Sequence, residues 1–155
     1  MDIRINQFVA IIITALTLIP GGAHVLELPN KMALGREQYF VVQSIYQGWA
    51  WLGVILILGI AANAVLAIRM RRQTGPMLCA AASTALIFMT LAIFFTWTFP
   101  ANQATANWMA VPEDWQSLRV QWEYSHAVNA ALTFVALCST TATVLIRPRY
   151  DRTNL

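Results

Sequence analysis

Four long apolar runs constrain the fold of this 155-residue chain more than any other feature of its sequence. They extend over residues 5–28, 47–68, 77–99 and 115–146, and each is continuous rather than alternating. About 20 apolar residues suffice for a helix to cross a bilayer, and only helices or closed barrels satisfy their backbone hydrogen bonds there. Because continuous runs of this length are typical of helices, we expect one all-α domain over residues 1–155, a bundle of four transmembrane helices.

The composition agrees with a membrane protein and disfavours a soluble or nucleic-acid-binding one. Hydrophobic residues make up 58% of the chain and charged residues 11%, whereas soluble domains carry about 25% charged residues. The net charge of +3 comes from basic residues that flank apolar runs, where membrane topology explains them. We therefore expect a lipid bilayer and no nucleic acid as a partner. Cys79 and Cys138 lie in apolar runs and are expected to be free and buried.

The distribution of basic residues predicts the orientation of the helices. Short cytoplasmic loops are enriched in Lys and Arg. One set of helix ends carries most of the basic residues: Arg4, Arg69, Arg71, Arg72, Arg147, Arg149 and Arg152. We therefore expect an integral protein of a bacterial inner membrane with both termini in the cytoplasm. The outer loops then hold Lys31, Arg36 and the residues between 100 and 114.

Two His–Glu pairs stand at the predicted outer ends of the first and last runs. His24 precedes Glu27 by three residues, and Glu123 precedes His126 by three. Residues three apart share a helical face. Pro29 is expected to end the first helix, and the last run is long enough to project beyond a hydrocarbon core of about 30 Å. The two pairs therefore fall at similar depth, and we expect the fold to bring them together in an outer-side pocket.

Several chemistries fit these two pairs, and the residues alone leave them open. An imidazole oriented by a carboxylate is a general base for a lipophilic phenol or ketone. A single transition metal could be held by four ligands, namely His24, Glu27, Glu123 and His126. A haem could take the two histidines as axial ligands, with Phe94, Phe95 and Trp97 as walls. Without a cofactor, Arg119 would pair with Glu123 at i, i+4 in a hydrogen-bonded network.

The longest connection, residues 100–114, is polar and aromatic, which predicts either a lid over the pocket or an interfacial belt. Asp114 is expected to cap the last helix. The aromatic and polar residues on both sides of the pocket are the candidate substrate-binding residues: Asn102, Trp108, Trp115, Arg119, Trp122, Tyr46 and Trp49. Elsewhere, Gly48, Gly53 and Gly59 are expected at close helix contacts, and Asn63 in an interhelical hydrogen bond.

The motifs resemble those of the DUF1772 family of four-helix membrane proteins. Residues 24–32 read His-Val-Leu-Glu-Leu-Pro-Asn-Lys-Met, and residues 43–49 read Gln-Ser-Ile-Tyr-Gln-Gly-Trp. The remaining matching positions are Tyr39, Pro100, Ala101, Asn102, Trp108, Trp115, Arg119, Trp122 and His126. The family includes anthrone oxygenases, which use O₂ and are not known to need a cofactor. The resemblance implies that Asn102, Trp122 and His126 are working residues. This chain differs in carrying Asn129 where many members have Arg.

Together these observations predict a membrane oxidoreductase or oxygenase that acts on a small lipophilic aromatic or quinol-like substrate. His126 would be the base, and Trp122 with Asn102 would hold the substrate. The alternative is a non-enzymatic membrane subunit that binds a metal or haem, or that packs in a homo-oligomer or a larger complex. No cofactor, a single transition metal and a haem are each compatible with the residues.

Overall fold

Each of the four apolar runs forms a long helical segment, as expected. The computed structural model describes residues 2–146. The segments are α1 (Ile3–Ala33); η2 (Trp49–Leu52) with α3 (Gly53–Arg69); α4 (Thr74–Ile93) with the π-helical turn η3 (Phe94–Thr98) and α5 (Phe99–Ala104); and α6 (Trp115–Leu145). All four are long and apolar enough to cross a membrane, and no strand occurs within residues 2–146. The prediction of an all-α, four-span bundle is confirmed.

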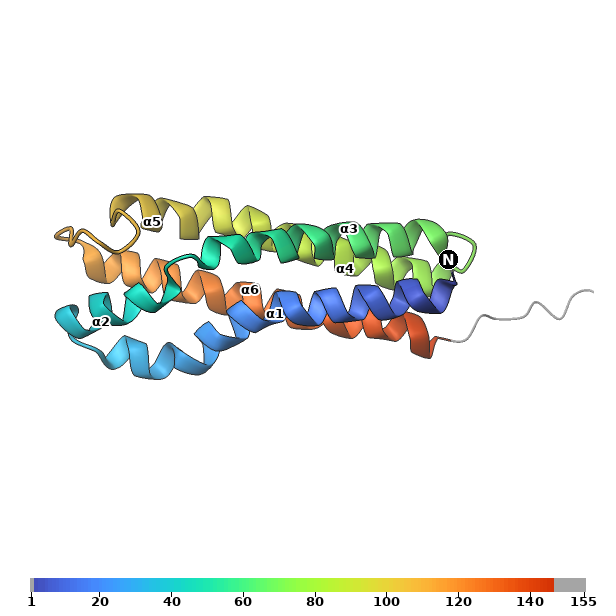
Figure 1. Ribbon diagram of the computed structural model, residues 1–155, viewed down its shortest axis with the longest axis horizontal. Coiled ribbons are helices and arrows are strands. Elements are labelled where there is room, and N and C mark those ends of the chain that lie inside the picture. Colours follow the sequence, from blue (N-terminus) through green and yellow to red (C-terminus); the bar gives the residue numbers. More distant parts are fainter. Residues whose placement is uncertain (1, 147–155) are drawn as a thin grey trace, which may run out of the picture.

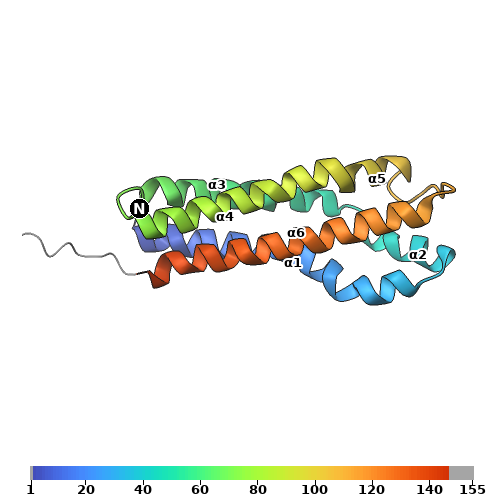
Figure 2. The same cartoon turned by 180° about the vertical axis from the view of Figure 1, so that it is seen from behind.

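The four segments pack as a closed ring of neighbours (Figures 1 and 2). α1 packs against α3 and α6, and α4 packs against the same two helices. The N-terminus, the α3–α4 turn and the end of α6 lie at one end of the bundle. The opposite end, called the distal end below, carries α2 (Arg36–Gln43), η1 (Ser44–Tyr46) and the loop of residues 105–114.

The first helix is longer than expected, and the prediction that Pro29 ends it is wrong. α1 contains both Pro20 and Pro29 and continues to Ala33. Proline within a membrane helix is tolerated where neighbouring groups compensate for the missing backbone hydrogen bond. Both views show α1 turning away from α6 in its second half (Figures 1 and 2). An internal proline is a usual cause of such a bend.

The third segment also extends beyond its predicted end. Residues 100–104 are helical, so the connection to α6 begins only at Thr105. Pro100 has no N–H to donate, and it follows a π-helical turn in which the N–H of Phe99 bonds to the carbonyl of Phe94. Asp114 lies at the N-cap position of α6, but its side chain makes no capping hydrogen bond. The predicted side-chain cap is therefore wrong.

A hydrogen-bonded network of buried polar side chains connects the four long segments in the half of the bundle opposite the distal end. Asn63 on α3 donates to Thr14 on α1 at 2.9 Å and accepts from Thr140 on α6 at 2.7 Å. The Thr140 hydroxyl lies 2.7 Å from that of Ser83 on α4. All four side chains are fully buried. The predicted interhelical hydrogen bond of Asn63 is confirmed.

The close helix contacts differ in part from those expected. A Cβ added to Gly59 would lie 3.1 Å from Thr17 Oγ1, which confirms the expectation there. For a Cβ added to Gly48 or Gly53, no atom of the described chain lies within 4 Å, so these two glycines are not at close helix contacts. Gly48 instead adopts a left-handed backbone conformation with a φ of +87°. The two cysteines are free, as expected, but Cys138 is exposed and Cys79 only half-buried.

Candidate functional site

The two histidines meet at the distal end, between the second half of α1 and α6. Their ring centroids lie 4.2 Å apart, and His24 is 3% exposed. Trp122 packs against both rings, with centroid distances of 4.9 Å to His24 and 4.3 Å to His126. Tyr46 and Trp49 pack on His24 at 4.5 and 5.7 Å. The predicted meeting of the two helix ends is therefore seen at the histidines.

Aromatic contacts, rather than carboxylates, hold the two imidazoles. Among residues 2–146, neither Glu27 nor Glu123 makes a hydrogen bond to a histidine. The predicted orientation of His126 by a glutamate is therefore wrong in this structure. The reason is that both carboxylates are engaged elsewhere in the same cluster.

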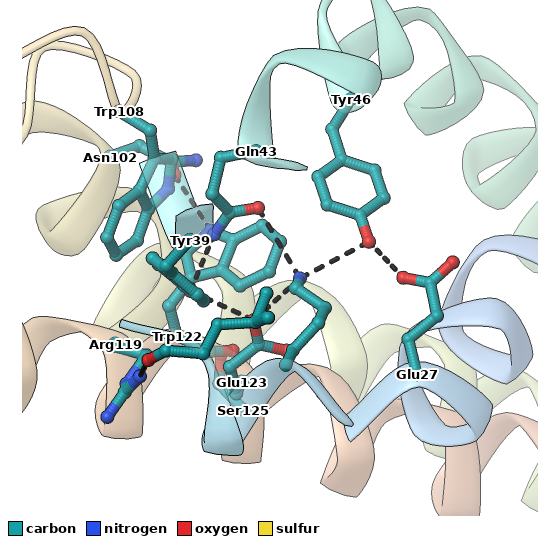
Figure 3. A network of polar contacts seen from close by, with 12 residues as sticks. Glu27, Tyr39, Gln43, Tyr46, Asn102, Trp108, Arg119, Trp122, Glu123 and Ser125 are labelled. Atoms are coloured by element: carbon teal, nitrogen blue, oxygen red, sulfur yellow. Dashed lines mark hydrogen bonds and ion pairs between the residues drawn. The ribbon is translucent and has the colours of Figure 1, made fainter. Parts of the chain in front are cut away.

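Glu123 is paired with a lysine that the sequence interpretation had assigned to an outer loop. Lys31 Nζ lies 2.6 Å from Glu123 Oε1, and the two side chains are 4% and 0% exposed. Lys31 also donates to Gln43 Oε1 at 3.4 Å and to the Tyr46 hydroxyl at 3.2 Å (Figure 3). A buried charge is tolerated when it is paired and hydrogen-bonded. Lys31 and Glu123 meet that condition for each other.

Three aromatic rings surround the Lys31 ammonium. Its Nζ lies 4.5 Å from the ring centroid of Tyr46, 4.7 Å from that of Trp122 and 5.5 Å from that of Tyr39. A cation over an aromatic face within about 6 Å is attracted by the ring quadrupole. Because Trp122 also packs on both histidines, it links the ion pair to the imidazoles.

Two tyrosines outside the long helices extend the cluster. Tyr39 donates to Glu123 Oε1 at 2.9 Å and accepts from Gln43 Nε2 at 2.6 Å, while Tyr46 donates to Glu27 Oε2 (Figure 3). Burial raises the pKa of Tyr39 above its ordinary value, and the negative charge of Glu123 raises it further. Burial and the hydrogen bond to Glu27 raise the pKa of Tyr46 in the same way. Both phenols are therefore protonated donors at neutral pH.

Asn102 fixes two tryptophans from different segments. Its Oδ1 accepts from Trp122 Nε1 at 2.8 Å and from Trp108 Nε1 at 3.1 Å (Figure 3). Trp108 is buried, with its ring 5.3 Å from that of Tyr39 and 5.7 Å from that of Trp122. The loop therefore covers part of the cluster through Trp108.

The backbone that presents Trp108 is left-handed at three consecutive residues. Ala106, Asn107 and Trp108 have φ values of 48°, 56° and 65°. Such conformations cost roughly 1–3 kcal/mol each for non-glycine residues and persist where the surroundings enforce them. Here Thr105 enforces this conformation through two hydrogen bonds. Its Oγ1 accepts from the Trp108 N–H at 3.1 Å, and its carbonyl accepts from the Ala110 N–H at 2.9 Å.

Arg119 bonds to the turn that follows α1 and not to Glu123, so the predicted Arg119–Glu123 pair is wrong. Its Nη1 donates to the carbonyl of Leu34 at 3.0 Å. The guanidinium carbon lies 4.9 Å from the ring centroid of Trp115 and 5.4 Å from that of Tyr39. Arg119 and Trp115 therefore brace the edge of the cluster.

Four buried polar atoms of this cluster have no hydrogen-bond partner within the part of the chain that the structure describes. They are His24 Nδ1, Arg119 Nε, Glu123 Oε2 and His126 Nε2. More than about 90% of buried polar groups in proteins find a partner. Acid–base groups that are buried together and not fully engaged by the protein are what a ligand-binding or catalytic site requires.

The predicted four-ligand metal site is not formed. Glu27 accepts from Tyr46, and Glu123 is taken up by Lys31 and Tyr39. Among the described residues, no group of three or more His, Cys, Asp or Glu side chains is arranged to hold a metal ion. The two carboxylates that would have to converge on one ion with the histidines are therefore bound to other partners.

The haem arrangement does not fit either. Axial ligation requires a porphyrin plane between the two imidazoles, but the rings are in contact at 4.2 Å. Two of the three expected walls, Phe95 and Trp97, are 60% and 49% exposed and so do not line the histidine cluster.

Sequence reasoning missed Lys31, Tyr39 and Gln43 as parts of the cluster. Lys31 lies four residues after Glu27 and seven after His24, which is one face of a continuous helix. That signal was hidden because Pro29 was interpreted as a helix end. Tyr39 and Gln43 share a face of α2 at i, i+4 spacing, but nothing local to α2 indicates which helix this face meets.

Comparisons with known proteins do not assign a family. The resemblance to DUF1772 stays a prediction, and the site is interpreted from its own geometry. No protein family matches the chain, and no curated protein or solved structure is significantly similar to it.

Proposed function

We propose that the protein is a membrane-bound oxidoreductase that oxidises a small lipophilic aromatic or quinol-like molecule with O₂. The observation that carries the proposal is the contact of His24 with His126 beside the buried Lys31–Glu123 pair, where each imidazole has a ring nitrogen without a partner among the described residues. Ionisable residues within membrane helices are costly and mark functional sites by default.

His126 is the base in this proposal. Its unpartnered Nε2 takes a proton from an activated C–H or O–H group of the substrate. Trp122, which packs on both histidines, supplies an aromatic face on which a flat substrate stacks. The Lys31 ammonium, whose bond to Gln43 is long at 3.4 Å and which lies 4.7 Å from the Trp122 ring centroid, is the nearby donor that stabilises negative charge on a substrate oxygen. Fixed donors of this kind act strongly in a site that excludes water.

For an anthrone-like methylene, the reaction is R₂CH₂ + O₂ → R₂CO + H₂O. Loss of one proton to His126 leaves a carbanion, which transfers an electron pair to O₂ and forms a C–O bond. Return of the proton gives a hydroperoxide. This hydroperoxide loses its second C–H proton and cleaves its O–O bond, which yields the ketone and water.

Oxygen uptake with anthrone in proteoliposomes tests the proposal. His126→Ala should lower the rate by about 10²–10⁴-fold, the usual contribution of a general base. Thr141→Ala is the matched control on the same helix, because among residues 2–146 the Thr141 hydroxyl bonds only to the carbonyl of Leu137. Circular dichroism shows whether both variants keep their helices. Oxygen uptake that His126→Ala leaves unchanged would exclude this mechanism.

The proposed orientation places the distal end outside and both termini in the cytoplasm of a bacterial inner membrane. Exposed Arg71 and Arg72 at the α3–α4 turn support it, because basic residues accumulate on the cytoplasmic side. Glu37, Glu113 and Asp114 are exposed at the distal end. Arg147, Arg149 and Arg152 belong to the same expectation but lie outside the described residues.

A second candidate function is that of a non-catalytic subunit in a homo-oligomer or larger membrane complex. It is favoured by the extent to which the cluster satisfies itself, with Lys31 on Glu123 and Tyr46 on Glu27. In that case the cluster only fastens α2 and η1 to the bundle. Purification of a stable monomer that consumes O₂ with anthrone would exclude it.

A further inference from the structure

A groove of about 490 Å³ opens on the surface of the bundle between α1 and α6. Its lining is apolar, and on the α6 side most of the residues are small. It consists of Leu18, Gly22, Val25 and Leu26 on α1 and of Ala127, Ala130, Ala131 and Phe134 on α6. These residues lie in segments suited to cross a membrane, so the groove faces lipid rather than water.

The groove lies at the level of the histidine pair. Val25 directly follows His24, and Ala127 directly follows His126. The histidines close the seam between the two helices with rings 4.2 Å apart. A second groove, of about 370 Å³, lies between the α4–η3 segment and α6. Neither histidine lines either groove, but the second groove has no α1 residue in its lining and so does not lie between the two helices that carry the histidines.

The first groove runs along the contact between α1 and α6, with lining residues on both sides of Gly21 and Ala130. A Cβ on Gly21 would lie 3.2 Å from Ala130, so the two helices touch there. Beyond this point α1 turns away from α6 (Figure 2). Around the Cβ position of the next residue, Gly22, no described atom lies within 4 Å. The helices therefore form a fork, closed at Gly21 and widening toward the distal end.

We infer that this α1–α6 groove is the lateral entrance through which a flat, uncharged aromatic substrate passes from the bilayer to His24 and His126. The inference rests on the proposed function. An apolar lining strongly disfavours a charged occupant, which would lose its hydration without compensation. The volume falls within the range of about 300–1,000 Å³ that small-molecule sites occupy. The buried acid–base groups between α1 and α6 are the site that such a molecule would reach.

Photolabelling with 4-hydroxybenzophenone, a small lipophilic phenol with a photoreactive ketone, tests the entrance without relying on turnover. The whole protein in phosphatidylcholine vesicles is irradiated with the probe, and the modified residues are mapped by mass spectrometry. Labelling should concentrate on the groove residues of α1 and α6 and fall when excess anthrone is added. Gly22→Leu fills open space and should lower this labelling by about tenfold, equivalent to 1.4 kcal/mol of binding.

Gly53→Leu is the matched control, since the Cβ position of Gly53 is equally free of neighbours within the described chain. It should leave the labelling unchanged. Ala131→Phe, at an exposed position on the opposite wall, should reproduce the effect of Gly22→Leu and guards against misfolding of one variant. Uniform labelling of lipid-facing residues on all helices, or labelling that neither groove variant reduces, overturns the inference. The inference is also overturned if added oleic acid reduces the labelling as strongly as anthrone does, because the groove then holds acyl chains.

The two proposals fail separately. If Gly22→Leu removes the labelling but no oxygen uptake is found with any aromatic substrate, the proposed reaction is lost and the entrance stands. If oxygen uptake depends on His126 but is unchanged in Gly22→Leu and Ala131→Phe, the reaction stands and the entrance is lost.

Discussion

Lys31 and Glu123 form an ion pair whose side chains are almost completely buried. Both are charged groups buried within membrane helices, and they come from opposite ends of the sequence. Replacing a buried ion pair by apolar residues is often neutral, but removing one partner leaves an uncompensated charge. Packing of the second half of α1 on α6 therefore requires both residues of the pair.

The first prediction concerns this dependence. Lys31→Met should lower the free energy of unfolding by about 3–5 kcal/mol, because Glu123 stays buried without its partner. The double variant Lys31→Met with Glu123→Leu should recover much of that loss. Unfolding in mixed micelles with increasing dodecyl sulfate measures both. Arg36→Met, at an exposed position on α2, is the control. The prediction would be contradicted if the double variant lost more free energy of unfolding than the two single variants lose in total.

The second prediction follows from the raised pKa of Tyr39. The unfolded phenol ionises near pH 10, whereas the folded one keeps its proton. Above about pH 10 the folded state therefore binds more protons than the unfolded state, and stability falls by up to about 1.4 kcal/mol per pH unit for this group. Tyr39→Phe should be less stable at pH 8 but lose less on going to pH 11. Val41→Ala, exposed on the same helix, should keep the original slope, and an unchanged slope in Tyr39→Phe would refute the argument.

At the scale of elements, the helices that could be predicted are those whose apolar runs are long enough to cross a bilayer. Their existence and order follow from length and composition alone. The ends were harder to predict, because Pro29 and Pro100 are local helix-breaking signals that the bundle overrides. The error at Pro29 moved Lys31 out of its helix and thereby hid the ion pair. Where α2 docks depends on contacts distant in sequence, which no local pattern specifies.

The third prediction tests the contact between α1 and α6. Gly21→Ala should destabilise the protein by about 1–3 kcal/mol, because the new methyl group meets the backbone and Cβ of Ala130 at 3.2 Å. Gly22→Ala is the matched control one residue away. Its methyl group enters open space, so the variant should be neutral or up to about 1 kcal/mol more stable through helix propensity. Equal effects at the two glycines would show that the helices do not fork at this point.

At the scale of the whole molecule, the bundle carries its polar groups inside and its apolar side chains outside. The network of Thr14, Asn63, Ser83 and Thr140 takes one residue from each long segment. Small and polar residues of this kind are typical of membrane helix interfaces, where lipid gives no hydrophobic reason for helices to associate. The network therefore specifies which helices are neighbours.

The fourth prediction follows from this network. Asn63→Leu removes its central member and should lower the free energy of unfolding by about 1–3 kcal/mol, since Thr14 and Thr140 lose partners in a buried site. Thr84→Ala is the control, because within the described part of the chain the Thr84 hydroxyl bonds only to the carbonyl of Ala80 in its own helix. It should change stability by less than about 1 kcal/mol. Similar losses in both variants, measured by the same detergent titration, would mean that the network adds nothing beyond local hydrogen bonds.

The proposed orientation of the bundle gives the last prediction, since it decides from which side of the membrane the distal end would be reached. With both native cysteines replaced by serine, Arg71→Cys and Glu113→Cys place a thiol at opposite ends of the bundle. In intact spheroplasts, an impermeant maleimide should modify Glu113→Cys and not Arg71→Cys, because basic loops remain in the cytoplasm. Inverted vesicles should reverse the pattern, which also shows that both thiols are reactive. Modification of Arg71→Cys in intact spheroplasts would place the histidine cluster toward the cytoplasm, and the α1–α6 groove would then open to the inner leaflet.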